Sequence, residues 1–153
     1  MYKRFDRALF EENDKKCRTK VKELLQNEGF AGVDNVKVRG VDILLYKDGN
    51  HIGYIEVERK AVWKGDKFQY DNVQFPERKA KYAKLDKPTI FVMFNEDMSK
   101  FLAVRDKDLL SSPCVEVPNK YVYKGEQFFQ VPLTKVKFDD ITELLKEIVN
   151  GQQ

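Results

Sequence analysis

Charged side chains occupy positions where a buried β-hairpin should carry apolar ones, and this conflict constrains the chain more than any other feature. Two apolar runs flank the turn signal Asp48-Gly49, which predicts a pair of strands. The second run ends in Glu56, Glu58 and Lys60, which share one face because side chains alternate along a strand. Burying such groups is costly unless something binds them.

A divalent cation is the simplest partner for these carboxylates. Converging carboxylates supply the hard oxygen ligands that Mg²⁺ prefers, and they leave positions for water and phosphate. These carboxylates are Glu56 and Glu58, and the first part of the hairpin carries one more acid, Asp42. The expected ion is Mg²⁺ or Mn²⁺.

The register of the hairpin decides whether Asp42 can join Glu56. A two-residue turn pairs Lys47 with Asn50 and leaves Asp42 on the wrong face, opposite residue 55. A three-residue loop pairs Lys47 with His51 and brings Asp42 opposite Glu56, and a β-bulge has a similar effect. The metal-site hypothesis therefore requires one of the last two arrangements.

Length and composition limit the class of protein. The 153 residues, 42% of them apolar and 35% charged, fit one globular domain over residues 1–153. No segment is apolar enough to span a bilayer, and the basic N-terminus lacks the apolar stretch of a signal peptide, so we expect a cytoplasmic protein. Cys17, Cys114 and His51 are too few for a zinc site or a disulfide framework.

Basic residues lie on both sides of the acidic hairpin, although the net charge is only +3. One run lies in a predicted helix before the hairpin and the other follows it; they comprise Lys15, Lys16, Arg18, Lys20 and Lys22, and Arg78, Lys79, Lys81, Lys84 and Lys87. Basic flanks around an acidic centre favour the binding of a phosphate group next to a metal ion that the acids hold. Each run alone is also explained as a solvated helix face.

Periodicity and turn signals predict a mixed order of elements. Helices are predicted over 14–27, 77–84 and 106–110 and after Asp139 or Asp140, and a loop over 63–71. Strands are predicted at 36–38, in the hairpin, over 89–94 and 100–104, and in a β-rich stretch made of 115–117, 121–123 and 127–131. Lys124-Gly125 is predicted to turn the chain inside the last β-rich stretch. The final helix should bury Ile141, Leu144, Leu145 and Ile148.

This order, with an Asp-bearing strand, a Glu-x-Glu strand and a basic helix, resembles the PD-(D/E)XK nuclease superfamily over about residues 14–105. Val41-Asp42 looks like the "PD" element, and Ile55 to Glu58 looks like the apolar-Glu-x-Lys element. The pattern is most similar to the Holliday-junction-resolvase and phage nuclease branch. The resemblance implies a restriction-endonuclease-like α/β (α+β) fold: a central mixed β-sheet flanked by helices, here with a β-rich extension and terminal helix over 106–153.

The activity that this resemblance implies is metal-dependent hydrolysis of phosphodiester bonds, by an endonuclease or exonuclease, with DNA as the expected substrate. Asp42 and Glu56 would hold the metal, Glu58 would be a further ligand or a base, and Lys60 or a lysine of the basic helix would stabilise charge on the phosphate. The nucleic-acid contacts would come from Arg59, Arg78, Lys79 and Lys81. The family often places an acid on the first helix, here Glu12 or Asp14.

One departure from the family pattern keeps other functions open. The usual lysine position holds Glu58, although the alternative frame Glu58-Arg59-Lys60 restores a Glu-x-Lys. A nucleic-acid-binding or protein-binding module that has lost catalysis is therefore an alternative, and Glu56, Glu58 and Lys60 could also be a solvated hairpin face. Self-association through the β-rich tail, for instance as a homodimer, is a further alternative. The choice between DNA and RNA is left open.

Overall fold

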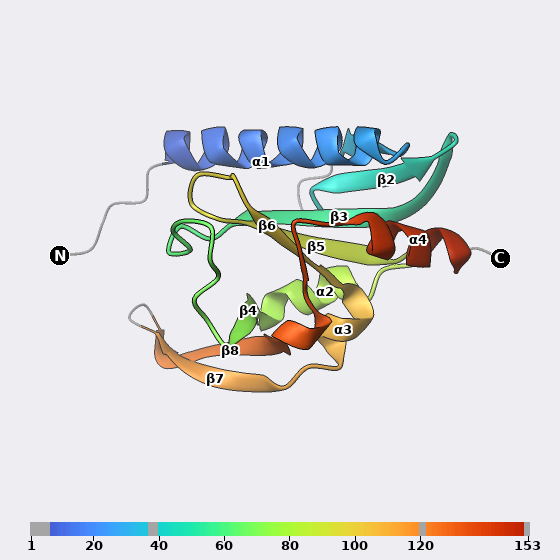
Figure 1. Cartoon of the computed structure of the whole chain (residues 1–153). Coiled ribbons are helices and arrows are strands. Elements are labelled where there is room, and N and C mark those ends of the chain that lie inside the picture. Colours follow the sequence, from blue (N-terminus) through green and yellow to red (C-terminus); the bar gives the residue numbers. More distant parts are fainter. Residues whose placement is uncertain (1–6, 37–39, 120–121, 152–153) are drawn as a thin grey trace.

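The computed structural model describes residues 7–36, 40–119 and 122–151 of the chain (Figure 1). The helices are α1 (Arg7–Asn27), α2 (Ala80–Ala83), α3 (Asp106–Leu110) and α4 (Thr142–Asn150), with 3-10 turns η1 (Glu77–Lys79) and η2 (Leu133–Lys135). The strands are β1 (Ala31–Asp34), β2 (Ile43–Lys47), β3 (Asn50–Arg59), β4 (Asn72–Pro76), β5 (Thr89–Phe94), β6 (Phe101–Arg105), β7 (Cys114–Asn119), β8 (Val122–Pro132) and β9 (Lys137–Phe138).

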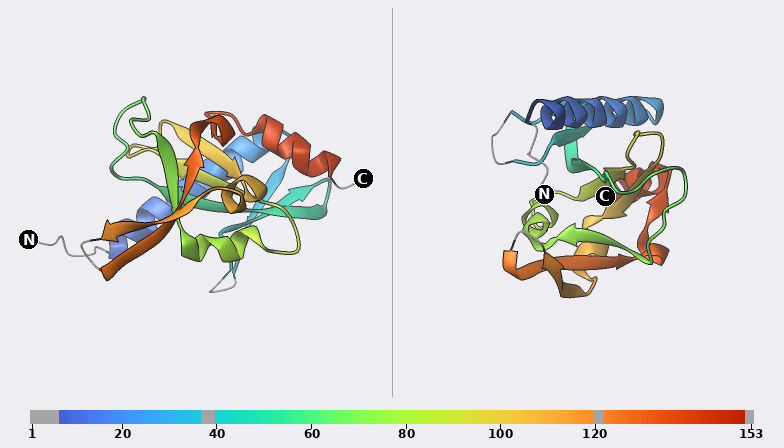
Figure 2. Two further views of the ribbon diagram at one scale, coloured as in Figure 1. Left: turned by 90° about the horizontal axis from the view of Figure 1, so that it is seen from below. Right: turned by 90° about the vertical axis from the view of Figure 1, so that its left-hand side faces the viewer.

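The described strands form two sheets. The main sheet has the order β1-β2-β3-β5-β6-β9, and the small sheet has the order β4-β8-β7. Strands β3 and β5 are parallel, whereas the other neighbouring pairs are antiparallel, so the main sheet is mixed. Figure 2 shows α1 on one side of the main sheet and the small sheet on the other. The predicted fold class, a central mixed sheet flanked by helices with a β-rich extension, is confirmed.

Strand β5 separates two apolar cores because all six of its residues are buried. Ile90, Val92 and Phe94 face a core shared with α1 and α4, and Phe91 and Met93 face a second core shared with the small sheet. A strand buried on both faces is apolar at every position, which is why this segment was predicted correctly from the sequence. Each such side chain contributes about 1.5–3 kcal/mol by leaving water.

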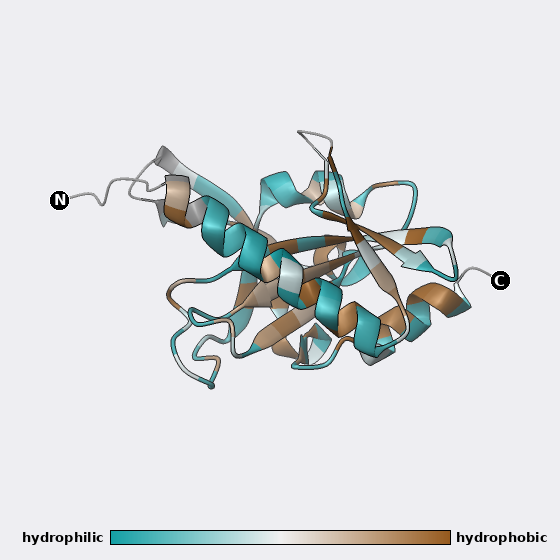
Figure 3. Ribbon diagram, turned by 90° about the horizontal axis from the view of Figure 1, so that it is seen from above, coloured by the Kyte–Doolittle hydropathy of each residue, from teal (hydrophilic) through white to brown (hydrophobic). Residues whose placement is uncertain are grey.

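Helix α1 is held on the sheet by a narrow apolar stripe. Cys17, Val21 and Leu25 are buried and follow helical spacing, while the outer face is largely hydrophilic (Figure 3). Helix α4 buries Ile141, Leu144, Leu145 and Ile148, as predicted. Its start is stabilised by Asp140, whose Oδ1 accepts a hydrogen bond from the Thr142 N–H at 2.8 Å.

The C-terminal extension contacts the predicted core directly. Strand β8 pairs with β4 from Asn72–Pro132 to Pro76–Phe128. Helix α4 joins the same apolar core as α1. The extension therefore adds both a layer below the main sheet and part of the core above it.

Two predicted elements, the first helix and the first strand, differ from the structure. The first helix begins at Arg7 rather than residue 14, because no glycine or proline interrupts the residues between. The first strand lies at 31–34, where Gly32 lets it approach α1 closely: a Cβ there would lie 2.9 Å from Leu25 Cδ1. The strand predicted over 36–38 falls mainly outside the described residues, and Val36 itself is not in a strand.

The turn predicted at Lys124-Gly125 is wrong, because both residues lie within β8. Val117 pairs with Glu126 and Asn119 pairs with Val122, so three residues of β8 oppose one residue of β7. Gly125, with φ +76°, lies in this bulge. A left-handed glycine is typical of turns and bulges alike, so the residue type did not distinguish them.

No described helix is both long enough and apolar enough to cross a membrane.

We predict that Gly53→Ala destabilises the fold where β3 meets β5. An added Cβ would lie 2.7 Å from the Pro88 backbone oxygen, which accepts a hydrogen bond from the Tyr54 N–H. The cost should be about 2–3 kcal/mol in urea unfolding. Gly65→Ala is the control: its Cβ meets no atom within 4 Å, and only its positive φ costs about 1 kcal/mol. Equal losses in the two variants would contradict the prediction.

Candidate active site

A two-residue turn and a bulge together set the register of the β2–β3 hairpin. Asp48 and Gly49 have φ values of 50° and 80°, as a type I′ turn requires, and Lys47 pairs with Asn50. Tyr46 pairs with His51, but Leu45 then pairs with Gly53, so residue 52 is an extra residue in β3. Of the two arrangements that would bring Asp42 opposite Glu56, the hairpin contains the bulge and not the three-residue loop.

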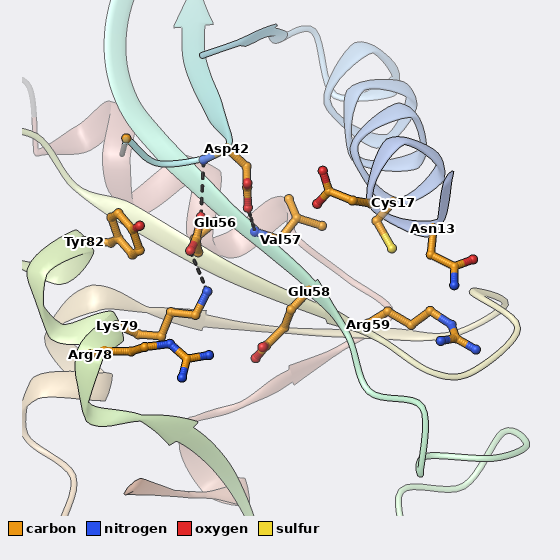
Figure 4. Close-up of a pocket in the computed structure, with 12 residues that line it drawn as sticks. Asn13, Cys17, Asp42, Glu56, Val57, Glu58, Arg59, Arg78, Lys79 and Tyr82 are labelled. Atoms are coloured by element: carbon orange, nitrogen blue, oxygen red, sulfur yellow. Dashed lines mark hydrogen bonds and ion pairs between the residues drawn. The ribbon is translucent and has the colours of Figure 1, made fainter. Parts of the chain in front are cut away.

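The shifted register carries Asp42 to the side of Glu56. Ile43 pairs with Ile55, and beyond this pair β2 ends while β3 continues. The side chain of Asp42 replaces the missing β2 backbone at this edge of β3: its Oδ2 accepts a hydrogen bond from the Val57 N–H at 2.8 Å. Its own N–H donates to Glu56 Oε1 at 3.2 Å (Figure 4). The two carboxylates that the sequence paired are therefore together.

A lysine from below the sheet completes the contacts of Glu56. Lys79 Nζ lies 2.7 Å from Glu56 Oε2, and the exposed fractions of the two side chains are 16% and 7%. Burial alone lowers the pKa of Lys79, but the charge and hydrogen bond of Glu56 outweigh it and raise that pKa. A buried pair of this kind is costly to break from either side.

Glu58 lies on the same face of β3 and has an unused ligand atom. Its Oε1 is buried and has no hydrogen-bond partner within the described part of the chain. Burial raises the pKa of Glu58, and the nearby cations Lys79, Lys60 and Arg78 oppose this shift. In Figure 4 its side chain extends to the same side as those of Arg78 and Lys79.

The edge of β3 is open to a cavity of about 440 Å³. The lining comes from α1, the segment before β2, β3, η1 and α2: Asn13, Asp14, Cys17, Gly40, Asp42, Glu56, Val57, Glu58, Arg59, Arg78, Lys79 and Tyr82. Because it wraps around a strand edge, the cavity receives side chains from both faces of β3. Asp14 lines it, whereas Glu12 forms an exposed ion pair with Lys16 and does not.

Two further acids in the cavity have raised pKa values. The pKa of Asp42 is raised to about 7 by burial, by its hydrogen bond to Glu56 and by the charge of Glu56, against the Val57 N–H and Lys79. The pKa of Asp14 is raised by burial and by Asp42, and lowered by Arg18. Burial is the main cause of both shifts, and repulsion between the acids adds to it; a bound cation would relieve that repulsion.

Other predicted site residues lie further from this pair of carboxylates. Lys60 Nζ lies over the Tyr70 ring, 5.1 Å from its centroid, and Lys60 does not line the cavity. Arg59 Nε donates to the Glu96 backbone oxygen at 2.6 Å, on the α1 side of the sheet. The frame Glu58-Arg59-Lys60 therefore does not bring a lysine into contact with Asp42 or Glu56, although Lys60 lies near enough to Glu58 for the charge of Glu58 to oppose the lowering of the Lys60 pKa by burial.

The predicted basic helix is present, but its basic side chains lie in different environments. Arg78 is 68% exposed and pairs with Glu126 at 3.2 Å at the rim. Lys81 is exposed, with its Nζ 5.0 Å from the centroid of the Tyr82 ring. Lys79 alone of the residues predicted to bind nucleic acid makes a direct contact with Glu56.

The contact of Lys79 with Glu56, and the placement of Tyr82 beside it, were missed from the sequence. A signal was present: a connection between the parallel strands β3 and β5 places its helix against the sheet next to β3. Within that connection, Lys79, Tyr82 and Ala83 follow the i, i+3, i+4 spacing of a helix face directed inward. The spacing identifies Lys79 as the lysine that faces the sheet.

The described residues contain no group of three or more His, Cys, Asp and Glu side chains arranged to hold a metal ion. The structure brings Asp42 and Glu56 together and does not gather Glu58 into a closed three-ligand set with them. Mg²⁺ commonly uses only one or two protein carboxylates together with water and phosphate. The unpartnered Oε1 of Glu58 adds a free oxygen nearby, so the residues fit an open magnesium site.

Comparisons with known proteins show similarity at the level of the fold. No family model and no curated protein matches the sequence. Among solved structures, a nuclease from a fusselovirus superposes with a TM-score of 0.53 at 13% sequence identity, over 100% of both chains. At this identity, the likeness shows a shared fold.

We predict that Asp42→Asn stabilises the metal-free protein at pH 8 and has little effect near pH 4. An acid whose pKa is raised on folding contributes stability below its unfolded pKa, and loses it as the pH rises through about 7. The amide avoids that loss and retains an acceptor for the Val57 N–H. The gain at pH 8 should be roughly 1–3 kcal/mol, measured by urea unfolding.

Asp66→Asn, in the exposed loop after β3, removes a charge without this burial and serves as the control. A gain at pH 8 no larger than that of the control would contradict the placement of Asp42.

Proposed function

We propose that this chain is a metal-dependent nuclease that hydrolyses phosphodiester bonds of nucleic acid, with DNA as the substrate and Mg²⁺ or Mn²⁺ as the cofactor. The observation that carries the proposal is the contact of Asp42 with Glu56 at the open edge of β3. These carboxylates share one cavity with Glu58 and Lys79. An acidic centre with cationic side chains around it suits the binding of a metal and a phosphate together.

In this proposal, Asp42 and Glu56 hold the metal, and the free Oε1 of Glu58 serves as a further ligand or as the base that orients water. When bound, the metal would lower the pKa of a water molecule and polarise the phosphate. Glu58 is suited to accept a proton, because burial raises its pKa above that of an ordinary carboxyl.

Lys79 has the role that the family pattern assigns to a lysine. Its ammonium is next to the carboxylates and would stabilise negative charge that develops on the phosphate. Lys60 is a weaker candidate because it packs on Tyr70 outside the cavity. Arg78 and Lys81, both exposed near the rim, would position the nucleic-acid backbone without reading bases.

The fold supports this proposal. The chain shares its fold with a nuclease from a fusselovirus. The "PD" element, just before β2, contacts the apolar-Glu-x-x element of β3, as membership of the PD-(D/E)XK superfamily would require. Both cysteines are free thiols, which suits a reducing cytoplasm.

A second candidate function is a nucleic-acid-binding module without catalysis. The observation that favours it is the Lys79–Glu56 pair, which neutralises Glu56 without any metal. The described residues also lack a closed three-ligand cluster. Such a module would keep its affinity for nucleic acid and would bind divalent ions weakly or not at all.

We predict that the protein cuts nucleic acid only with Mg²⁺ or Mn²⁺, and that Glu56→Gln lowers the rate about 100-fold or more. The amide keeps the shape of Glu56 but removes the charge that holds the metal. Supercoiled plasmid, single-stranded DNA, a four-way junction and RNA should each be assayed by gel electrophoresis.

Glu12→Gln is the matched control, since Glu12 is exposed and outside the cavity, and its rate should equal that of the wild type. Cutting that survives Glu56→Gln would rule out this site. No cutting of any substrate, with nucleic-acid binding intact, would favour the binding module.

A further inference from the structure

The carboxylate of Glu56 is already paired with a cation, the Lys79 ammonium. Its Oε2 contacts Lys79 Nζ at 2.7 Å, and its Oε1 accepts the Asp42 N–H at 3.2 Å. Both oxygens of the predicted metal ligand are therefore engaged; Glu56 is buried and Lys79 is partly buried. We propose that Lys79 blocks this site in the free protein, and that a phosphate group of the substrate draws Lys79 away and frees Glu56. The proposal rests on the proposed function.

Two cations cannot easily share one buried carboxylate. Repulsion between like charges is weakly screened where water is excluded, and Glu56 is 7% exposed. A divalent ion beside Glu56 and an ammonium at 2.7 Å from it are therefore alternatives. The location of the Lys79 ammonium therefore decides whether Glu56 is available to a metal ion.

The surroundings of Lys79 give it a place to move. Lys79 ends η1, a three-residue turn without buried residues, and its side chain has a long flexible stem. The Tyr82 ring lies near, with its centroid 5.7 Å from Lys79 Nζ, and cations are attracted to such ring faces. The ammonium can thus leave Glu56 by side-chain rotation while the backbone of η1 stays in place.

A phosphate supplies the reason for the ammonium to move. Phosphate oxygens offer Lys79 an anionic partner that replaces Glu56. Because coupling between two ligands is reciprocal, the same switch makes a bound divalent ion raise the affinity for the phosphate. The site would then hold its metal poorly without substrate and well with it.

Calcium titration by isothermal calorimetry tests this blocking role without any turnover. Ca²⁺ binds oxygen ligands of the same kind as Mg²⁺. Lys79→Gln should bind Ca²⁺ about tenfold more tightly than the wild type, because Glu56 is released. Lys79→Arg keeps a cation on Glu56 and should stay near the wild type. Lys81→Gln removes the same charge from the same segment, but outside the cavity, and should change the affinity less than twofold.

The coupling to phosphate is measured by adding a short single-stranded oligonucleotide. It should raise the Ca²⁺ affinity of the wild type at least fivefold, and that of Lys79→Gln clearly less. Nuclear magnetic resonance of the Lys79 ammonium, identified by its loss in Lys79→Arg, gives a readout in the wild-type protein itself. The oligonucleotide should shift this signal even in the presence of a metal chelator.

The outcomes separate the two proposals. Equal Ca²⁺ affinity in the wild type and Lys79→Gln, or an ammonium signal that the oligonucleotide leaves unchanged, overturns the blocking role and leaves the metal site intact. If neither the wild type nor any variant binds Ca²⁺ at millimolar concentration, the proposed metal-dependent function fails, and the blocking role fails with it.

Discussion

The bulge at residue 52 of β3 is the feature on which the candidate site depends. Without this extra residue, the two-residue turn at Asp48 and Gly49 would pair Asp42 with Ile55 and turn its carboxylate to the opposite face. With it, Ile43 pairs with Ile55, and Asp42 reaches the Val57 N–H beyond the end of β2. One extra residue in β3 thus sets the position of an acid that lies just before β2. Bulges often serve to redirect side chains next to functional sites.

The site also shows an electrostatic conflict that the fold does not resolve internally. Burial raises the pKa of Asp14, Asp42 and Glu58, and one partly buried cation, Lys79, pairs with Glu56. A protein selected for stability alone would gain by replacing such groups with apolar ones. Under the proposed function, a bound cation that brings positive charge into the cavity would resolve this conflict. Substrate phosphate would then return negative charge and satisfy the lysine.

The sequence predicts the parts of this structure that follow from repeating patterns. Strand β5 reads as a continuous apolar run, and α4 shows its buried face at helical spacing, so both were located correctly. The face shared by Glu56 and Glu58 likewise follows from strand alternation. Contacts between distant segments are a different matter. The contact of Asp42 with Glu56 depends on a bulge that no residue type in the sequence indicates. The same two-residue turn is compatible with a hairpin register with the bulge and with one without it.

The contact of Lys79 with Glu56 is a second example of a contact between distant segments that was not predicted from the sequence. Five lysine and arginine residues lie close together in that region, and composition alone does not say which one faces the sheet. Lys60, two positions after Glu58, shares its face in an ideal strand but lies beyond the end of β3 and packs on Tyr70 instead. The short β1 and the bulge at Gly125 were misjudged because glycine permits several backbone conformations that a single sequence does not distinguish.

The most direct test of the account is a crystal structure with Mn²⁺, in which anomalous scattering locates the ion without reference to any assumed chemistry. The account predicts a peak in contact with both Asp42 and Glu56, with Lys79 Nζ no longer on Glu56. A structure at saturating Mn²⁺ with no peak between these carboxylates, and with the Lys79–Glu56 pair intact, would contradict it.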